Sequence, residues 1–234
     1  VGKSHIGLHK TLKDLAKAKC EIFRKQLSWQ SNLRYCFINS NGVFHELVCK
    51  KAQNAGYKLL SYTGEDKVSE NINLVYSVGA FFGLKSDLIE KGLKIFQTSS
   101  HRMKIYRFST ITLLDDSYNS NPEGVIYALQ FLRQFSGRKI CVLADMLELG
   151  SSSYNEHKNI LDTVKNEGVD VVFVYGEQFS SVVSEFDFVS YFSDINQLNV
   201  QLNNELKAND VVLIKGSRSM KMERVVNYIR HERG

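Results

Sequence analysis

Hydrophobic and polar positions alternate regularly only from about residue 107 onward. There, short runs rich in β-branched residues alternate with longer stretches whose apolar positions recur at helical spacing. The short runs predict strands at 111–115, 139–144, 170–175, 188–192 and 211–215. The longer stretches predict helices at 122–135, 153–167, 195–206 and 222–231, with a weaker one at 179–185.

Two of these predicted strands, in VDVVFVYG and DVVLIKG, are apolar throughout. Such runs indicate strands covered on both faces, which are typical of parallel sheets with helical crossovers. Pro122 after Asn121 suits a helix start, because proline fits the first turn and asparagine caps it. Gly168 suits a helix stop. The second part of the chain is therefore predicted to be a doubly wound α/β domain with a mainly parallel sheet.

The first part of the chain is less regular. It predicts helices at 11–23, 44–54, 73–82 and 87–96, the last capped by Ser86, and strands at 35–39 and 58–62. There is no internal repeat and no linker rich in Gly, Ser or Pro. We place a domain boundary near residues 99–102, which divides the chain into domains at 1–100 and 101–234.

Composition excludes several classes of protein. With 234 residues, 43% of them apolar and 24% charged, the chain is predicted to fold rather than to be disordered. No apolar run approaches 18 residues, so we expect no membrane insertion. The four cysteines form no C-x-x-C pair, which favours reduced thiols and a cytoplasmic location. Because the first residue is Val1, we expect the chain to be a piece of something longer.

The charge is unevenly distributed. Residues 1–100 hold 15 Lys and Arg against 8 Asp and Glu, whereas residues 101–234 hold 15 against 17. A nucleic-acid partner, a bound polyphosphate and a merely solvated basic surface all remain open interpretations of the basic first part.

Three features near the start of the chain are candidates for chemistry. Gly2, Lys3 and Ser4 match only the end of a phosphate-binding P-loop. His5 is either a metal ligand or a loop histidine without a role. Lys19 lies on the apolar side of a predicted helix, and since burying an ammonium is costly, it either reaches solvent, is paired or is chemically altered.

The densest polar cluster is LLDDSYNSNP, residues 113–122, which directly follows a predicted strand and precedes a helix. The carboxyl ends of strands in doubly wound sheets are where ligands bind. Two further strands end in ADMLELG and KGSRS. Polar residues at three strand ends predict one continuous crevice, although asparagine-rich turns also serve as plain caps. Its members include Asp145, Glu148, Lys215, Ser217 and Arg218.

These segments together resemble a known family. DDSYNSNP, GRKICVLADMLELG at 137–150, His157 and VVLIKGSRSMKMERVV at 211–226 resemble the C-terminal domain of the MurF-type Mur ligases. SHIGLHKTLKDLAKAKCEIF is similar to AHLxxxGSLxxIAxAKxEIF of their central ATPase domain. The resemblance covers nearly the whole chain. It implies an ATP-dependent amide ligase that adds D-alanyl-D-alanine to UDP-MurNAc-tripeptide during peptidoglycan precursor synthesis.

The resemblance also implies roles for individual residues. His5 would be a ligand of Mg²⁺, and Lys19 would be the family's carbamylated lysine, also at the metal. Asn71, Arg102 and Asp116 would bind ATP. The site of the dipeptide and the reaction intermediate would be bordered by Asn119, Asn121, Asp145, Lys215, Ser217 and Arg218. We expect no nucleic-acid partner and a monomer.

The sequence departs from the family pattern in several places. The N-terminal sugar-binding domain, the P-loop and a glutamate-bearing strand are missing, and only eight residues separate Tyr62 from Asn71. Lys67 stands where the family has a histidine, and His101 where it has a glycine. We therefore expect an incomplete ligase that alone does not hydrolyse ATP at a useful rate. The alternative is a non-catalytic α/β remnant that binds nucleotide or dipeptide without turnover.

Overall fold

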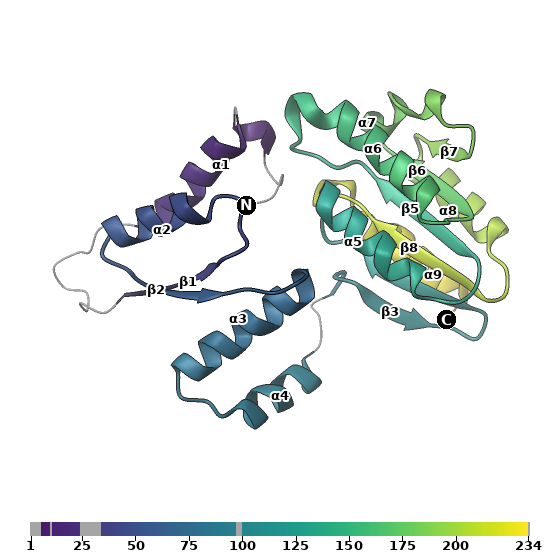
Figure 1. The fold of residues 1–234 in the computed structure, drawn as a ribbon. Helices are drawn as coiled ribbons and strands as arrows, with labels where there is room; N and C mark the ends of the chain where they lie inside the picture. The colour runs from purple at the N-terminus through teal and green to yellow at the C-terminus, as the bar shows by residue number, and fades with distance from the viewer. Residues whose placement is uncertain (1–5, 10, 24–33, 97–99, 234) are drawn as a thin grey trace. The chain divides into compact units, whose positions relative to one another are not determined.

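The computed structural model describes residues 6–9, 11–23, 34–96 and 100–233 (Figure 1). The chain divides into two compact units, each of which is described here by itself. Of the described residues, unit 1 takes in 9, 11–23 and 34–96, and unit 2 takes in 6–8 and 100–233. Within the described ranges, no helix has the length and apolar character needed to cross a membrane.

Unit 1 contains two parallel strands, β1 (Tyr35–Asn39) and β2 (Lys58–Tyr62), joined by helix α2 (His45–Asn54). The other helices of unit 1 are α1 (Leu12–Lys19), which continues into a short 3₁₀ turn η2 (Cys20–Ile22), then α3 (Lys67–Phe81) and α4 (Ser86–Ile95). The order strand, helix, strand is the one that the sequence pattern predicts for this part, whereas the parallel pairing of the two strands was not predicted.

Two helix starts in unit 1 differ from the prediction. Helix α3 begins six residues before the predicted start at 73, because Asp66 and Ser69 form a reciprocal capping box ahead of the apolar positions. Ser86 is the first residue of α4 rather than its cap, so that prediction is wrong: Lys85 occupies the cap position, without a side-chain hydrogen bond.

Unit 2 is built on a six-stranded sheet in the order β3-β4-β8-β5-β6-β7. All neighbouring strands pair in parallel except β3, which is antiparallel to β4. The strands are β3 (Lys104–Arg107), β4 (Ile111–Asp116), β5 (Lys139–Ala144), β6 (Val171–Tyr175), β7 (Val189–Phe192) and β8 (Asp210–Lys215). The predicted mainly parallel α/β fold is confirmed. Strand β3 was not predicted, since it has only four residues and both of its ends are exposed.

Helices cover both faces of this sheet (Figure 1). They are α5 (Pro122–Arg133), α6 (Ser153–Asn166), α7 (Glu177–Ser180), α8 (Ile195–Glu205) and α9 (Glu223–Arg233). Short 3₁₀ turns are η1 (Ile6–Leu8), η3 (Gly150–Ser152), η4 (Val183–Glu185) and η5 (Arg218–Met220). The single helix predicted at 179–185 is wrong: α7 begins earlier and η4 follows as a separate turn.

The core of unit 2 lies in two layers, one on each face of the sheet. Leu213 of β8 packs in the layer with α5 and α6, whereas the next residue, Ile214, packs in the layer with α8 and α9. Both side chains are fully buried. Strand β8 is apolar throughout because both of its faces are covered.

We predict that Leu213→Ala lowers the free energy of unfolding of the chain by about 2–5 kcal/mol, because a cavity remains in a packed layer. Chemical denaturation followed by circular dichroism measures it. Val200→Ala is the control, since Val200 on α8 is 53% exposed, and it is expected to change stability by less than about 0.5 kcal/mol. Equal effects of the two substitutions would contradict the placement of β8 at the centre of the sheet.

Candidate functional site

The carboxyl ends of β4, β5 and β8 line one cleft in unit 2. The cleft has a volume of about 270 Å³. Its lining residues come from the segments that follow these three strands: Tyr118, Asn119, Ser120, Asn121, Leu147, Glu148, Ser217, Arg218 and Ser219. The crevice that the polar clusters predict at three strand ends is therefore present as one cleft. We call it the strand-end cleft.

A buried ion pair fixes the first wall of the strand-end cleft. Lys215, at the end of β8, is only 5% exposed, and its Nζ lies 2.5 Å from Oδ2 of Asp116 at the end of β4. The same ammonium donates a hydrogen bond of 2.9 Å to the backbone oxygen of Asn119. Asp116 Oδ1 in turn accepts from the backbone N–H of Met103. A buried ammonium needs such partners, so Lys215 holds the loop after β4 in place.

The next residues of this loop begin helix α5. The side-chain oxygen of Asn121 accepts from the backbone N–H of Gly124 at 2.7 Å, and Pro122 occupies the first turn. The predicted helix start is confirmed. Asn121 thus serves as a cap and lines the strand-end cleft at the same time.

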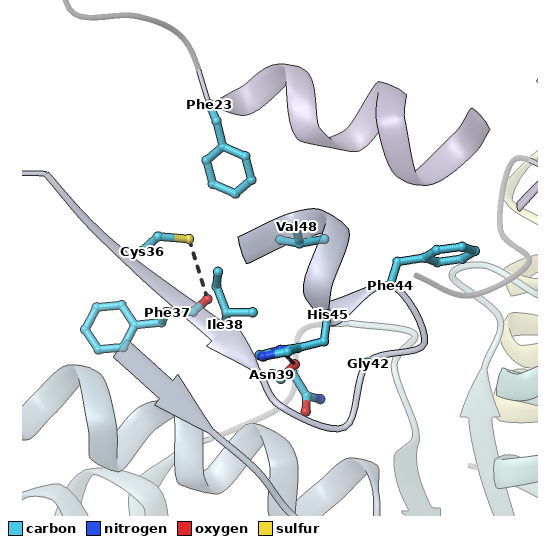
Figure 2. A pocket seen from close by; sticks show the side chains of 9 residues that line it. All are labelled: Phe23, Cys36, Phe37, Ile38, Asn39, Gly42, Phe44, His45 and Val48. Atoms are coloured by element: carbon cyan, nitrogen blue, oxygen red, sulfur yellow. Dashed lines mark hydrogen bonds between the residues drawn. The ribbon is translucent and has the colours of Figure 1, made fainter. Parts of the chain in front are cut away.

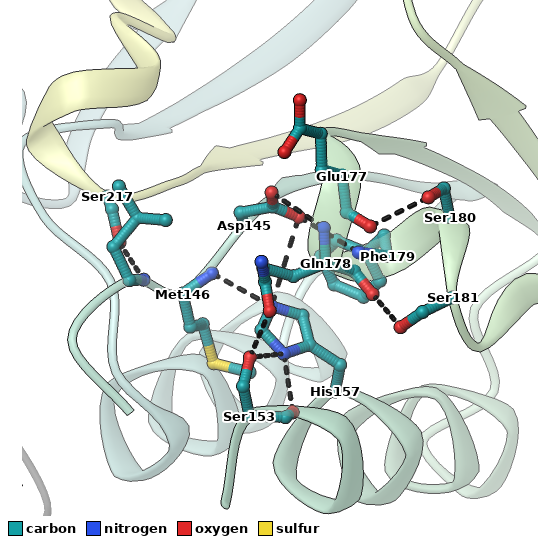
Figure 3. Close-up of polar contacts among 11 residues, drawn as sticks. Asp145, Met146, Ser153, His157, Glu177, Gln178, Phe179, Ser180, Ser181 and Ser217 are labelled. Carbon is teal, nitrogen blue, oxygen red and sulfur yellow. Dashed lines mark hydrogen bonds and ion pairs between the residues drawn. The ribbon is translucent and has the colours of Figure 1, made fainter. Parts of the chain in front are cut away.

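Ser217 and Asp145 fix the opposite wall (Figure 3). Ser217 Oγ accepts from the backbone N–H of Leu147 at 2.8 Å, and Ser217 N–H donates to the backbone oxygen of Asp145. The Asp145 carboxylate is 3% exposed and accepts from the backbone N–H groups of Gln178 and Phe179. These bonds explain why α7 begins before the predicted position. A carboxylate at the start of a helix satisfies its unpaired N–H groups.

Gly176 allows this approach. Its φ is +120°, and a Cβ there would lie 2.4 Å from the Asp145 carboxylate. Asp145 does not line the strand-end cleft; it borders a neighbouring pocket of about 400 Å³ with Leu147, Tyr175 and Gln178.

His157 of α6 supports the same wall from within the core (Figure 3). Its side chain is fully buried. Its Nε2 accepts from the backbone N–H of Met146 at 3.0 Å, and its Nδ1 lies 2.7 Å from the backbone oxygen of Ser153. Accepting at Nε2 and donating at Nδ1 requires the neutral ring. Burial accordingly lowers the pKa of His157 below its ordinary value.

Two arginine side chains lie over the ring of Tyr118, a lining residue of the strand-end cleft. The guanidinium of Arg102 lies 4.0 Å from the centre of the Tyr118 ring, and that of Arg218 lies 5.7 Å away. Both distances fit cation–π contacts. Arg218 is exposed and also pairs with Glu223 at 3.3 Å. An exposed guanidinium fixed on a ring suits the binding of a phosphate or carboxylate.

His101, next to Arg102, has a φ of +64°, which is a backbone conformation that favours glycine. Its ring Nδ1 lies 2.7 Å from Oδ2 of the buried Asp115, and its backbone oxygen accepts from Tyr118 N–H. These two contacts stabilise the left-handed backbone conformation of His101, at the position where the family that the sequence resembles has glycine.

The remaining predicted site residues belong to unit 1 or lie outside the described residues. Asn71 is exposed on α3, in unit 1. Lys19 ends α1 and is exposed, which fits the alternative in which its side chain reaches solvent; the buried residues of α1 are Leu15 and Ala16. His5 lies outside the described residues. Within the described part of the chain, no group of three His, Cys, Asp or Glu side chains is placed to hold a metal ion.

Unit 1 contains a pocket of about 180 Å³ between α2, β1 and Phe23 (Figure 2). Its lining is mainly apolar, and His45 Nδ1 lies 3.1 Å from the backbone oxygen of Asn39. It includes none of the predicted site residues.

Sequence reasoning missed four lining residues of the strand-end cleft and one contact that supports it. Tyr118 and Ser120 stand inside the DDSYNSNP cluster and Ser219 stands inside KGSRS, but they were not singled out, and Leu147 is an apolar residue in a polar segment. The supporting contact is distant in sequence: Gly7 N–H donates to the backbone oxygen of Glu148 at 2.7 Å, so η1 supports the loop after β5. No local pattern in the sequence indicates that contact.

Comparisons with known proteins agree on one family. The model described as Mur ligase, glutamate ligase domain, matches residues 101–218, and that of the Mur ligase middle domain matches residues 1–111. A relative from Buchnera aphidicola, named UDP-N-acetylmuramoyl-tripeptide--D-alanyl-D-alanine ligase, is 29% identical over 95% of this chain and 57% of its own length. A relative of the same name from Haemophilus influenzae is 32% identical over 71% of this chain and 38% of its own length.

Solved structures show the same fold. MurF from Acinetobacter baumannii matches with a TM-score of 0.84 and 21% identity, over 99% of this chain and 58% of that one. MurF from Thermotoga maritima in complex with ADP matches with a TM-score of 0.80 and 19% identity, over 99% of this chain and 60% of that one. The chain therefore spans a little more than half the length of the Buchnera relative and of these two solved structures.

We predict that His157 makes stability fall as the pH falls. Its folded pKa is lowered, so the unfolded state takes up the proton first as pH drops through about 6.5. The stabilisation contributed by neutral, buried His157 is present above that pH. Below it, this contribution to the free energy of unfolding is lost at a rate of at most about 1.4 kcal/mol per pH unit. Urea denaturation between pH 8 and pH 5 should show a shallower pH dependence for His157→Asn than for the unsubstituted chain.

His231→Asn is the matched control, because that histidine side chain is 88% exposed. It should keep the pH dependence of the unsubstituted chain. If His157→Asn keeps it as well, His157 is not buried in the neutral form.

Proposed function

The chain belongs to the Mur ligase family, and we propose that the protein containing it is a MurF-type ligase, which joins D-alanyl-D-alanine to UDP-MurNAc-tripeptide at the expense of ATP. The names of the relatives support this activity. The observation that carries it is the strand-end cleft, which gathers Asn119, Asn121 and Arg218 at the carboxyl edge of a parallel sheet. The same proposal includes a role in peptidoglycan synthesis, a cytoplasmic location and a monomeric state.

We assign the strand-end cleft to the dipeptide. Bound ATP supplies the phosphoryl group that activates the tripeptide carboxylate. The cleft then orients the dipeptide so that its amine attacks the carbonyl carbon of the acyl phosphate; the bond to phosphate breaks, inorganic phosphate leaves, and the amine nitrogen loses a proton as the amide forms. Positioning of the two reactants accounts for much of such an acceleration. Arg218 and Asn119, both exposed in the cleft, are the residues that we propose contact the dipeptide. Lys215, Asp145 and Ser217 act by positioning the walls.

ATP-binding roles are proposed for residues of each unit separately. Arg102 beside Tyr118 and Asp116 belong to unit 2, and Asn71 belongs to unit 1. A solved structural neighbour contains ADP, which supports a nucleotide site in proteins of this fold. Asp116 is already engaged by Lys215 and Met103, so its remaining acceptor capacity is what a ribose would use.

The metal site is proposed from resemblance alone. Mg²⁺ prefers oxygen ligands, and a carbamate on Lys19 would supply them, whereas an unmodified lysine does not. The described residues around Lys19 offer no cluster of further ligands. No reaction step proposed for the strand-end cleft is assigned to the metal.

A second candidate is a binding module without turnover. One observation favours it: β2 and α3 are joined by only residues 63–66, and this short connection is closed by the Asp66 capping box. The capping box satisfies the backbone N–H groups of Asp66 and Ser69 with side chains of the same two residues. A module of this kind would bind nucleotide or dipeptide and would form no amide.

The test is a ligase assay on the protein encoded by the complete gene, with ATP, Mg²⁺, UDP-MurNAc-tripeptide and D-alanyl-D-alanine. We expect the amide product and stoichiometric ADP. Absence of product, with retained binding of nucleotide or dipeptide, would favour the binding module; absence of both would overturn the proposal.

In the same assay we predict that Arg218→Ala lowers kcat/KM for D-alanyl-D-alanine by about 10-fold to 100-fold, since a charge-assisted hydrogen bond is lost. The KM for ATP should stay within about twofold. Arg133→Ala is the matched control, because Arg133 is also an exposed arginine with one weak ion pair, to Glu167 at 3.7 Å, and lines no described pocket. A loss of the same size in both variants would contradict the assignment of Arg218.

A further inference from the structure

Ser120 is an unusual member of the strand-end cleft. It lies between Asn119 and the helix cap Asn121 and is only 6% exposed. Within the described part of the chain, its hydroxyl has no hydrogen-bond partner. Buried hydroxyl groups are nearly always paired, because losing water without a replacement costs free energy. An unpaired hydroxyl in the wall of a cleft therefore points to a ligand that completes its hydrogen bonding.

Ser117, three residues earlier, shows that the chain readily pairs a serine in this loop. Its side chain is also buried, and its Oγ donates to Asp115 Oδ1 at 2.6 Å. Ser217, across the cleft, accepts from Leu147 N–H. Two of the three buried serines around the cleft thus have structural partners. Ser120 differs from them in being a lining residue of the cleft whose hydroxyl is buried without one.

The surroundings of Ser120 indicate the chemical class of the ligand. Ser120 directly precedes Asn121, the N-cap of α5, a helix of 12 residues whose N-terminus favours negative charge. The exposed guanidinium of Arg218 lines the same cleft. A hydroxyl, a guanidinium and a helix N-terminus together suit a carboxylate.

The other lining residues indicate the size of the ligand and the groups that it carries besides the carboxylate. Leu147 and the ring of Tyr118 provide apolar surface, and Glu148 provides one acidic side chain. A volume of about 270 Å³ is just below the range of roughly 300–1,000 Å³ that is usual for drug-sized ligands. The cleft therefore suits a small zwitterion that carries a carboxylate, an amine and short apolar side chains.

We propose that the Ser120 hydroxyl donates a hydrogen bond to the terminal carboxylate of the incoming dipeptide, beside Arg218. This inference rests on the proposed function and adds a specificity residue to it. The carboxylate end is fixed at Ser120 and Arg218, so the amine end is left to face the reacting centre. A dipeptide whose carboxylate is blocked loses this contact.

The test compares Ser120→Ala with Ser117→Ala and Ser190→Ala in the 234-residue chain. Calorimetric titration measures binding of D-alanyl-D-alanine and of its C-terminal amide, and thermal unfolding measures Tm. We expect Ser120→Ala to weaken binding of the free acid by about 10-fold to 100-fold, as for hydrogen bonds to charged groups. Binding of the amide, already weak, should hardly change.

The Tm separates a ligand-binding role from a structural one. Ser120→Ala removes an unpaired hydroxyl and should leave Tm unchanged or raised, whereas Ser117→Ala breaks a buried bond and should lower it. Ser190 is exposed on β7 and lines no described pocket, so Ser190→Ala should alter neither quantity.

The other outcomes of the titration and of the Tm measurement show whether this inference or the proposed function fails. If the chain binds the dipeptide and Ser120→Ala binds it equally well, this inference is overturned and the proposed function stands. If Ser120→Ala weakens the free acid and the amide alike, the hydroxyl does not contact the carboxylate. If Ser120→Ala lowers Tm as Ser117→Ala does, the hydroxyl has a structural role. If the unsubstituted chain binds no dipeptide, the assignment of the cleft in the proposed function fails as well.

Discussion

The strand-end cleft depends on one buried ion pair, between the Lys215 ammonium and the Asp116 carboxylate. Their strands, β8 and β4, are neighbours in the sheet, so the two side chains meet where the strands end. The ammonium is almost wholly removed from water and would be costly without a partner. Its second bond, to the Asn119 backbone oxygen, places the loop that carries Tyr118 and Ser120. Removing Lys215 would therefore disturb the wall of the cleft rather than one contact in it.

The buried and exposed polar residues of the cleft have different tasks. The side chains of Asp145 and Ser217 form hydrogen bonds with backbone N–H groups, and these bonds fix the loop after β5 and the start of α7. Asn119 and Arg218 are exposed and remain accessible to a ligand. Ser120 combines burial with an unpaired hydroxyl. A site built in this way is preorganised, since its rigid parts are already satisfied before a ligand arrives.

Much of unit 2 could be predicted from the sequence, because its central strands are apolar on both faces and some of its helix ends carry clear signals. Asn121 with Pro122, and Gly168 after α6, are such local signals. What could not be predicted depends on contacts distant in sequence. The start of α7 is set by Asp145, more than thirty residues earlier, and the loop after β5 is held by Gly7. The four-residue strand β3 exists because it pairs with β4.

The candidate site was predictable to a similar degree. Polar clusters at three strand ends correctly indicated one cleft, because parallel strands bring their carboxyl ends to the same edge. The role of each residue within the cleft could not be predicted, since a sequence does not show which polar side chains are already hydrogen-bonded to other groups. Lys19 illustrates the same limit: helical periodicity placed it on the apolar side of α1, but the lysine lies at the end of the helix, where its side chain is exposed.

The most direct measurement is an NMR titration of the ¹⁵N-labelled chain with D-alanyl-D-alanine. If the strand-end cleft is the dipeptide site, saturable shifts of backbone amides will be concentrated in the segments 118–121, 147–148 and 217–219, which line it. Shifts confined to unit 1, or to the pocket around Tyr175 and Gln178, would contradict this placement. An absence of shifts at saturating dipeptide would contradict the cleft as a binding site for that substrate.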